Sequence, residues 1–305
     1  MPILLYKRTP EPSLFARVCT AKNLWQAWKR VKQNNGGPGI DGVTLDAYEQ
    51  QVGRHLEQLR QQLVSGHYRP SPVRRVSIPK EDGNRRELGI LTIQDRVAQR
   101  AVLNVLEETY ERLFADCSFG YRPDRSVQLA LKRAVRLHRW GYNWLVDGDI
   151  TAFFDNVRHP LLLRFVREDI GEEPLVSLIA AWLAAAPAGY RRRWWIGPRE
   201  VVGLVQGGIL SPVLSNAYLH RFDRALAARD IKLVRFADDF LGFTKTQEDA
   251  RQVLRIIERQ LKRLGLTLNW EKTRICHFHD GFTFLGREFT LSARYVGTKS
   301  CRWCT

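Results

Sequence analysis

Several features are scarce or missing in this sequence, and each absence excludes some classes of protein. The five cysteines are an odd, scattered set without the spacing of a disulfide framework, which favours a reducing, cytoplasmic compartment. The longest apolar stretch, residues 175–187, is shorter than the roughly 20 residues of a membrane span, so we expect a buried helix and no membrane partner. The N-terminal apolar run is too short for a signal peptide. Pro-rich or Gly/Ser linkers and internal repeats are also missing.

Acidic residues are in deficit. The 305 residues carry 48 Lys and Arg against 32 Asp and Glu, which gives a net charge of +16. This charge has two interpretations. The protein is simply a basic soluble protein, or its basic surface binds a polyanionic partner such as nucleic acid. Because 44% of the residues are hydrophobic, the chain can bury a core of one or two domains.

The hydrophobic pattern predicts helices interleaved with hairpins. Residues 20–66 are expected to be helical around a Gly/Pro loop, followed by two strands near 73–78 and 86–90 with a turn at 82–84. A helix then begins at Thr92, which forms a capping-box pattern with Asp95. From residue 145 the expected order is strand, helix, helix, hairpin, helix, strand, strand. This order indicates an α+β fold with a mainly antiparallel sheet.

Two adjacent aspartates, Asp238 and Asp239, interrupt the apolar run LVRFADDFLGF. A hairpin turn alone would explain them. However, the apolar flanks predict that the hairpin is buried, and Asp149 ends another apolar strand that can lie beside it. Carboxylates brought together in this way repel one another unless cations lie among them. Oxygen ligands of this kind suit Mg²⁺ shared with substrate phosphates.

Seven ordered stretches between about residues 34 and 289 resemble the reverse transcriptase family. RFADDF resembles its Tyr-Ala-Asp-Asp motif, with Phe236 in the tyrosine position. The others are SIPKEDGNRRELGILTIQDRVAQRAV, SFGYRPDRS, VDGDITAFFDNV, VQGGILSPVLSNAYL, LGLTLNWEKT and FTFLG. The sequence is most similar to the bacterial group II intron lineage, which includes CRISPR-associated and free-standing enzymes.

The resemblance implies a catalytic centre with two Mg²⁺ ions, for which Mn²⁺ is a possible substitute. Asp149, Asp238 and Asp239 are the implied metal ligands, together with the backbone carbonyl of Ile150. Lys272 matches the lysine proposed to protonate the pyrophosphate leaving group; a merely solvated lysine is the alternative.

The resemblance also implies residues that hold the incoming dNTP. Lys80 and Arg86 match the residues that hold its triphosphate, with Arg85 as a rival for Arg86. Phe154 matches the steric gate that excludes a ribose 2′-OH, although core packing would also explain a phenylalanine. Gln206 and Gly207 match the family's loop that lies under the primer and the incoming nucleotide.

Other positions are expected to contact nucleic acid. The stretch GYRRRWWIG combines arginines with aromatic rings, which is a nucleic-acid-binding pattern and equally a hairpin pattern. Arg122, in the second family block, joins this set. The predicted contacts are therefore Arg122, Arg191, Arg192, Arg193, Trp194 and Trp195.

The resemblance implies a right-hand polymerase with fingers and palm. We expect the N-terminal extension and fingers in residues 1–140, the palm in 141–290, and a short tail in 291–305, so that a thumb is missing, truncated or supplied by a partner. Cys301 and Cys304 have the spacing of half a zinc or redox site, without a second such pair in the sequence.

The implied activity is primer extension on an RNA template, from a DNA or RNA primer, with dNTPs. CRISPR adaptation integrase proteins are possible partners. The alternatives are an intron-encoded fragment or splicing cofactor that binds RNA without polymerising, and an antiphage defence enzyme. Gln206 argues against retroelements that mutate target genes, and Phe154 and Ala237 argue against viral RNA-dependent RNA polymerases.

Overall fold

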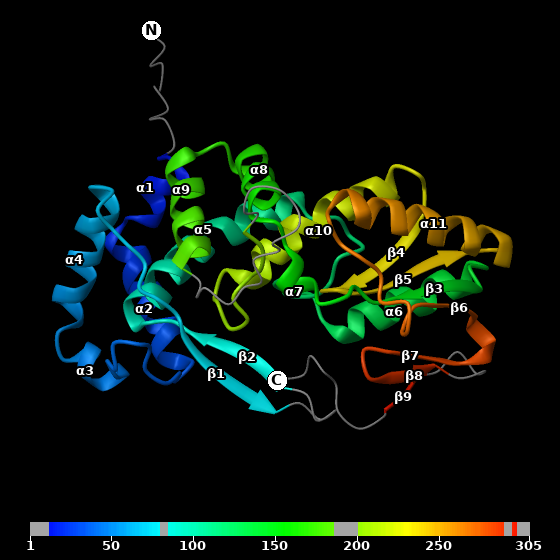
Figure 1. Ribbon diagram of the computed structural model, residues 1–305, viewed down its shortest axis with the longest axis horizontal. Coiled ribbons are helices and arrows are strands. Elements are labelled where there is room, and N and C mark those ends of the chain that lie inside the picture. Colours follow the sequence, from blue (N-terminus) through cyan, green and yellow to red (C-terminus); the bar gives the residue numbers. More distant parts are fainter. Residues whose placement is uncertain (1–11, 80–84, 186–200, 290–294, 298–305) are drawn as a thin grey trace, which may run out of the picture.

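The computed structural model describes residues 12–79, 85–185, 201–289 and 295–297. Its first part is a group of helices that ends in a two-stranded hairpin, and its second part is a sheet covered by helices on both faces (Figure 1). The α+β fold with an antiparallel sheet is confirmed.

The N-terminal helices pack around one long helix. That helix, α5 (Ile93–Leu113), is capped by the Thr92 side chain, which accepts a hydrogen bond from the Asp95 amide, and it buries an apolar face that includes Ala98, Ala101, Val102, Val105 and Leu106. Against it or near it lie α1 (Leu14–Val18), α2 (Ala21–Gln33), α3 (Leu45–Glu49) and α4 (Val52–Val64). The predicted capping of the long helix is therefore correct.

The predicted hairpin that follows the N-terminal helices is present. Strands β1 (Arg74–Pro79) and β2 (Arg85–Ile90) pair antiparallel, with Val76 opposite Leu88. Their bounds differ from the expected ones by one residue. The predicted turn at residues 82–84 lies outside the described residues.

A four-stranded antiparallel sheet forms the centre of the second part. Its order is β4 (Lys232–Phe236), β5 (Asp239–Thr244), β3 (Trp144–Gly148) and β6 (Arg274–His277). Side chains alternate between the two faces. Leu145 and Leu241 pack with α6 (Val127–Arg139), whereas Val146 and Phe240 belong to the core that includes α10 (Ser211–Ala227) and α11 (Gln247–Arg263).

The remaining elements connect and flank this sheet. They are α7 (Phe153–Asn156), α8 (His159–Ile170), α9 (Glu173–Ala185), a 3₁₀ turn η1 (Phe278–Asp280), and the small sheet β7 (Phe282–Phe284), β8 (Arg287–Phe289) and β9 (Tyr295–Gly297). The apolar stretch at 175–187 forms most of α9, which buries Leu175, Val176 and Ile179. Within the described part of the chain, no helix has the length and apolar character needed to cross a membrane.

Candidate active site

The adjacent aspartates lie at a tight hairpin turn between β4 and β5. Phe236 pairs with Asp239, so Ala237 and Asp238 form a two-residue loop. Ala237 has a φ of 56°, a left-handed conformation that costs an alanine about 1–2 kcal/mol. The flanking rings of Phe236 and Phe240 are buried, while Asp238 and Asp239 are half-buried. The apolar flanks thus anchor the hairpin and leave its acidic turn at the edge of the sheet.

Asp149 reaches the same edge because β3 pairs antiparallel with β5. The last pair is Gly148 opposite Phe240, and continuing this register places Asp149 opposite Asp239. Gly148 allows this close approach, since a Cβ there would lie 2.3 Å from the Phe240 ring. The predicted side-by-side arrangement of the two acid-bearing strands is present.

A turn at residues 269–272 orients Asp149. The Asn269 amide donates to the Asp149 carbonyl oxygen at 2.9 Å, and its Nδ2 donates to Oδ2 at 3.0 Å. Lys272 Nζ lies 3.5 Å from the same Oδ2. The carboxylate is therefore held through one of its two oxygens. Sequence reasoning missed Asn269, although its place four residues after Gly265 in the stretch LGLTLNWEKT was a usable signal.

The register after β3 determines on which side of the strand the carbonyl of Ile150 lies. Ile150 forms a bridge with Leu268, and the hydrogen bonds on either side use the Asp149 carbonyl and the Thr151 amide. Because neighbouring residues of a strand direct their polar groups to opposite sides, the N–H and C=O of Ile150 face the β5 side. This orientation agrees with its predicted role as a ligand.

The donors at this edge fit a hard divalent cation. They are carboxylates and a backbone carbonyl, all oxygen ligands of the type that Mg²⁺ prefers. No three His, Cys, Asp or Glu side chains among the described residues are grouped closely enough to hold a metal ion by themselves. This incomplete set is compatible with Mg²⁺, which keeps several coordination positions for water and substrate phosphates.

A further carboxylate, Asp147, lies on β3 two residues before Asp149 and was missed by sequence reasoning. Burial raises its pKa to about 6, and Asp149 adds to the increase, while Arg274 opposes it. Arg274 Nε lies 3.1 Å from Asp147 Oδ2. The pair joins β3 to β6 next to the candidate metal ligands.

The loop with Gln206 and Gly207 connects α7, which follows Asp149 in the chain, to the hairpin β1–β2. The Leu204 amide donates to the Phe154 carbonyl at 2.7 Å, and the Gly89 amide donates to the Gln206 carbonyl at 2.7 Å. Gly207 has a φ of 99°, and a Cβ there would lie 2.9 Å from the Gly89 carbonyl oxygen. Phe154 itself is half-buried, whereas Phe153 is fully buried.

Comparison with known proteins decides the family. Residues 78–289 match the family model described as reverse transcriptase (RNA-dependent DNA polymerase). The chain belongs to the reverse transcriptase family. The acidic edge formed by β3, β4 and β5 lies within the matched range.

Curated relatives of this reverse transcriptase above 30% identity include a group II intron-encoded protein. Group II intron-encoded protein LtrA of Lactococcus lactis is 34% identical over 78% of this chain and 39% of its own length. Protein YkfC of Escherichia coli is 35% identical over 82% of this chain and 74% of its own length. The chain thus spans well under half of LtrA. The predicted resemblance to the group II intron-like lineage is confirmed.

A solved structure supports the fold. Apo telomerase from Candida tropicalis matches 79% of this chain and 59% of its own chain, with a TM-score of 0.55 and 14% identity. At this identity the likeness concerns the fold alone, and it agrees with the reverse transcriptase fold.

Several predicted contacts of the reverse transcriptase stay predictions. Lys80 and the segment with Arg191, Arg192, Arg193, Trp194 and Trp195 lie outside the described residues, as do Cys301 and Cys304. Arg86 lies in β2 opposite Ile78.

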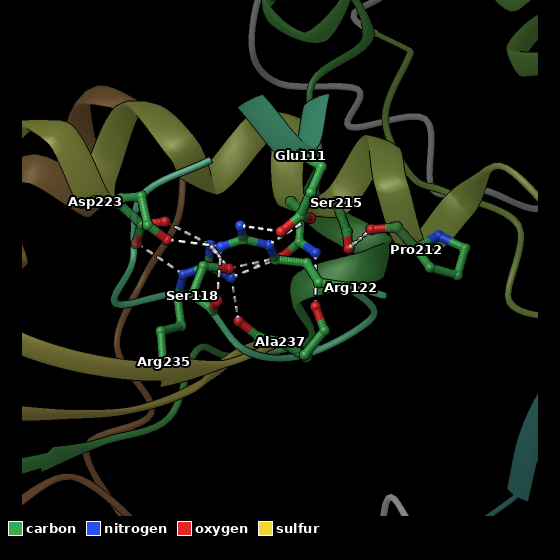
Figure 2. A network of polar contacts seen from close by, with 11 residues as sticks. Glu111, Ser118, Arg122, Pro212, Ser215, Asp223, Arg235 and Ala237 are labelled. Atoms are coloured by element: carbon green, nitrogen blue, oxygen red, sulfur yellow. Dashed lines mark hydrogen bonds and ion pairs between the residues drawn. The ribbon is translucent and has the colours of Figure 1, made fainter. Parts of the chain in front are cut away.

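Arg122 is placed differently from its predicted role. Its side chain is 2% exposed and pairs with Glu111, with Nη2 2.6 Å from Oε1. Nη1 donates to the carbonyls of Ala115 and Ser118. Figure 2 shows this guanidinium surrounded by protein acceptors. A buried and bonded guanidinium cannot also contact nucleic acid, so this placement corrects the expectation.

Proposed function

We propose that this chain extends a primer 3′-OH with dNTPs on an RNA template. The observation that carries the proposal is the pairing of β3 with β5, which brings Asp149 to the edge that bears Asp238 and Asp239. These carboxylates lie within the range that matches the reverse transcriptase family. Carboxylates can hold the cations that phosphoryl transfer needs beside an anionic substrate.

The acidic residues would hold Mg²⁺ through Asp149, Asp238, Asp239 and the Ile150 carbonyl. When bound, the ions would lower the pKa of the primer hydroxyl and offset charge on the phosphates. Asn269 keeps the Asp149 carboxylate oriented before substrate arrives. The ammonium of Lys272, next to Asp149, is suited to give a proton to the departing pyrophosphate.

Phe154 supports a DNA product. Its backbone is fixed by Leu204, its ring packs edge-on against Phe153 at 5.7 Å between centroids, and it is half-buried five residues after Asp149. A ring held in this way would clash with a 2′-OH on the incoming nucleotide. We therefore assign Phe154 to sugar selection, and the Gln206–Gly207 loop to the support of primer and nucleotide.

The rival function is RNA binding without polymerisation, as in a splicing cofactor. The similarity to an intron-encoded protein is what favours this rival. A protein that only binds RNA has no need for clustered carboxylates, because they would repel an anionic ligand. We therefore rank RNA binding without polymerisation second. Roles in CRISPR spacer acquisition, with integrase partners, or in phage defence stay predictions.

Primer extension separates the two functions. A DNA primer annealed to RNA is incubated with dNTPs and Mg²⁺, with wild type beside Asp238→Ala. We expect extension by wild type and its loss in the variant, with RNA affinity unchanged. Absent extension by wild type, with tight RNA binding, would favour the binder.

A further inference from the structure

Arg235, the next-to-last residue of the strand that leads to the acidic turn, has a fully buried guanidinium. All five of its N–H groups have acceptors. Nε and Nη2 donate to the two oxygens of Asp223 at 2.8 and 2.5 Å, and Nη2 also donates to Ser118 Oγ at 2.8 Å. Nη1 donates to Asn216 Oδ1 at 3.0 Å and to the Ala237 carbonyl at 2.9 Å.

The acceptors come from three separate parts of the fold, as Figure 2 shows. Asp223 and Asn216 lie on α10, Ser118 lies in the loop before α6, and Ala237 lies in the turn. The guanidinium therefore fixes the position of the turn relative to α10 and this loop.

The loop also contacts the turn directly. It runs beside β4, where the Arg235 amide donates to the Cys117 carbonyl at 2.7 Å and the Phe119 amide to the Arg235 carbonyl at 2.8 Å. Asn216 Nδ2 holds the Gly120 carbonyl at 2.7 Å. A Cβ on Gly120 would lie 2.5 Å from the Ala237 amide nitrogen, so the loop backbone supports the turn backbone.

The bond to the Ala237 carbonyl has a direct geometric consequence. That carbonyl belongs to the peptide unit that joins Ala237 to Asp238, and a peptide unit is planar. Holding its oxygen restrains rotation of that plane, and with it the position of the Asp238 Cα from which the carboxylate side chain extends. A left-handed Ala237 needs such support, because the conformation is unfavourable for alanine.

We propose that Arg235, held by Asp223, Ser118 and Asn216, is a positioning residue that keeps the Ala237–Asp238 peptide in the orientation needed for metal binding. The proposal rests on the proposed function of Asp238. A buried ion pair is often replaceable by apolar residues without loss of stability, so the role assigned here is geometric rather than stabilising.

Two variants test the role. Arg235→Lys keeps the charge beside Asp223 but lacks the fork that reaches Ala237. The double variant Arg235→Met with Asp223→Leu replaces the pair by apolar residues, which preserves folding in comparable cases. The matched control is Arg221→Met with Asp169→Leu, an arginine–aspartate pair 2.8 Å apart between α10 and α8.

The readouts are melting temperature, Mn²⁺ affinity by electron paramagnetic resonance, and single-turnover primer extension on RNA. We expect the Arg235 variants to melt within a few degrees of the control and to bind Mn²⁺ less tightly. We also expect them to extend primers about 100-fold more slowly, the effect of a misplacement near 1 Å. The control pair should match wild type in affinity and rate.

Two results would overturn the inference. One is Mn²⁺ affinity and extension in the Arg235 variants equal to the control, and the other is losses that follow melting temperature alone in every variant. Asp238→Ala run in parallel separates the two proposals. If that variant still binds Mn²⁺ and extends primers, the proposed function has failed; if it is inactive while the Arg235 variants are normal, only the positioning role has failed.

Discussion

Two neighbouring phenylalanines have different surroundings, and the difference decides which one can act on substrate. Phe153 is 2% exposed and belongs to the main core, whereas Phe154 is half-buried and only borders it. A ring at the border of the core can meet a nucleotide while its backbone stays fixed. Core packing therefore explains Phe153, and the proposed role of sugar gate belongs to Phe154.

Shortening Phe154 should relax sugar selection. In Phe154→Val the 2′-OH no longer meets a ring, so we expect ribonucleotide incorporation relative to dNTP to rise by about tenfold or more, a difference of roughly 1.4 kcal/mol. The measurement is kcat/KM for matched dNTP and rNTP on one RNA template. Phe153→Leu is the control, because it should lower stability and leave the ratio unchanged. An unaltered ratio in Phe154→Val would remove Phe154 from the gate.

Gly207 is required by backbone geometry. In Gly207→Ala the φ of 99° is strained, and the new Cβ would lie 2.9 Å from the Gly89 carbonyl. We expect a loss of about 1–3 kcal/mol of unfolding free energy and weaker primer extension. Gly141→Ala is the control, since its φ is 86° but no atom lies within 4 Å of the new Cβ. Equal losses of activity in both variants would show that the Gln206–Gly207 loop has no special role.

At the scale of elements, the sequence was sufficient where the information is local. The apolar flanks of Asp238 and Asp239 predicted a buried hairpin with the acids at its turn, and β4 and β5 have this form. The apolar strand that ends at Asp149 was expected to lie beside this hairpin, and β3 pairs with β5. Thr92 predicted the start of α5, because a capping side chain bonds only a few residues ahead.

Arg235 and Arg122 could not be placed from local pattern. The acceptors of Arg122 lie 4 to 11 residues before it, in α5 and in the loop that follows, where no strand or helix period relates them. For Arg235 the most distant acceptor, Ser118, is 117 residues away. The sequence did hold one signal: Arg235 stands between two apolar residues of the strand KLVRF, which indicates that its charge is buried and paired. A strand pattern gives no means of naming that partner, because packing of α10 against β4 supplies it.

The buried pair and an exposed pair of the same hairpin should differ in stability. Asp223→Ala leaves a buried guanidinium unpaired, so we expect a loss of about 3–5 kcal/mol in unfolding free energy. Asp230→Asn removes the charge of an exposed pair with Lys232, in which Asp230 is 85% exposed, and keeps a residue type that tolerates the left-handed φ of 56° at this position, so it should cost less than about 1 kcal/mol. Urea denaturation measures both. Similar losses for the two variants would contradict the account of the buried network.

At the scale of the molecule, the net charge of +16 should dominate RNA binding. If about five phosphates are neutralised, affinity for single-stranded RNA should fall about 100-fold between 50 and 200 mM salt. Fluorescence anisotropy with a labelled RNA measures the slope. A change below about threefold would mean that the basic surface does not face the nucleic acid.

The most direct test of the central claim is the rate of one-nucleotide addition to a DNA primer on RNA, measured across Mg²⁺ concentrations. Asp238→Asn keeps the shape of the side chain and removes its charge. Asp230→Asn is the control, in the turn that precedes β4. We predict a loss of at least about 100-fold in Asp238→Asn at every Mg²⁺ concentration, with Asp230→Asn equal to wild type. A rate in Asp238→Asn within a few-fold of wild type would contradict the account.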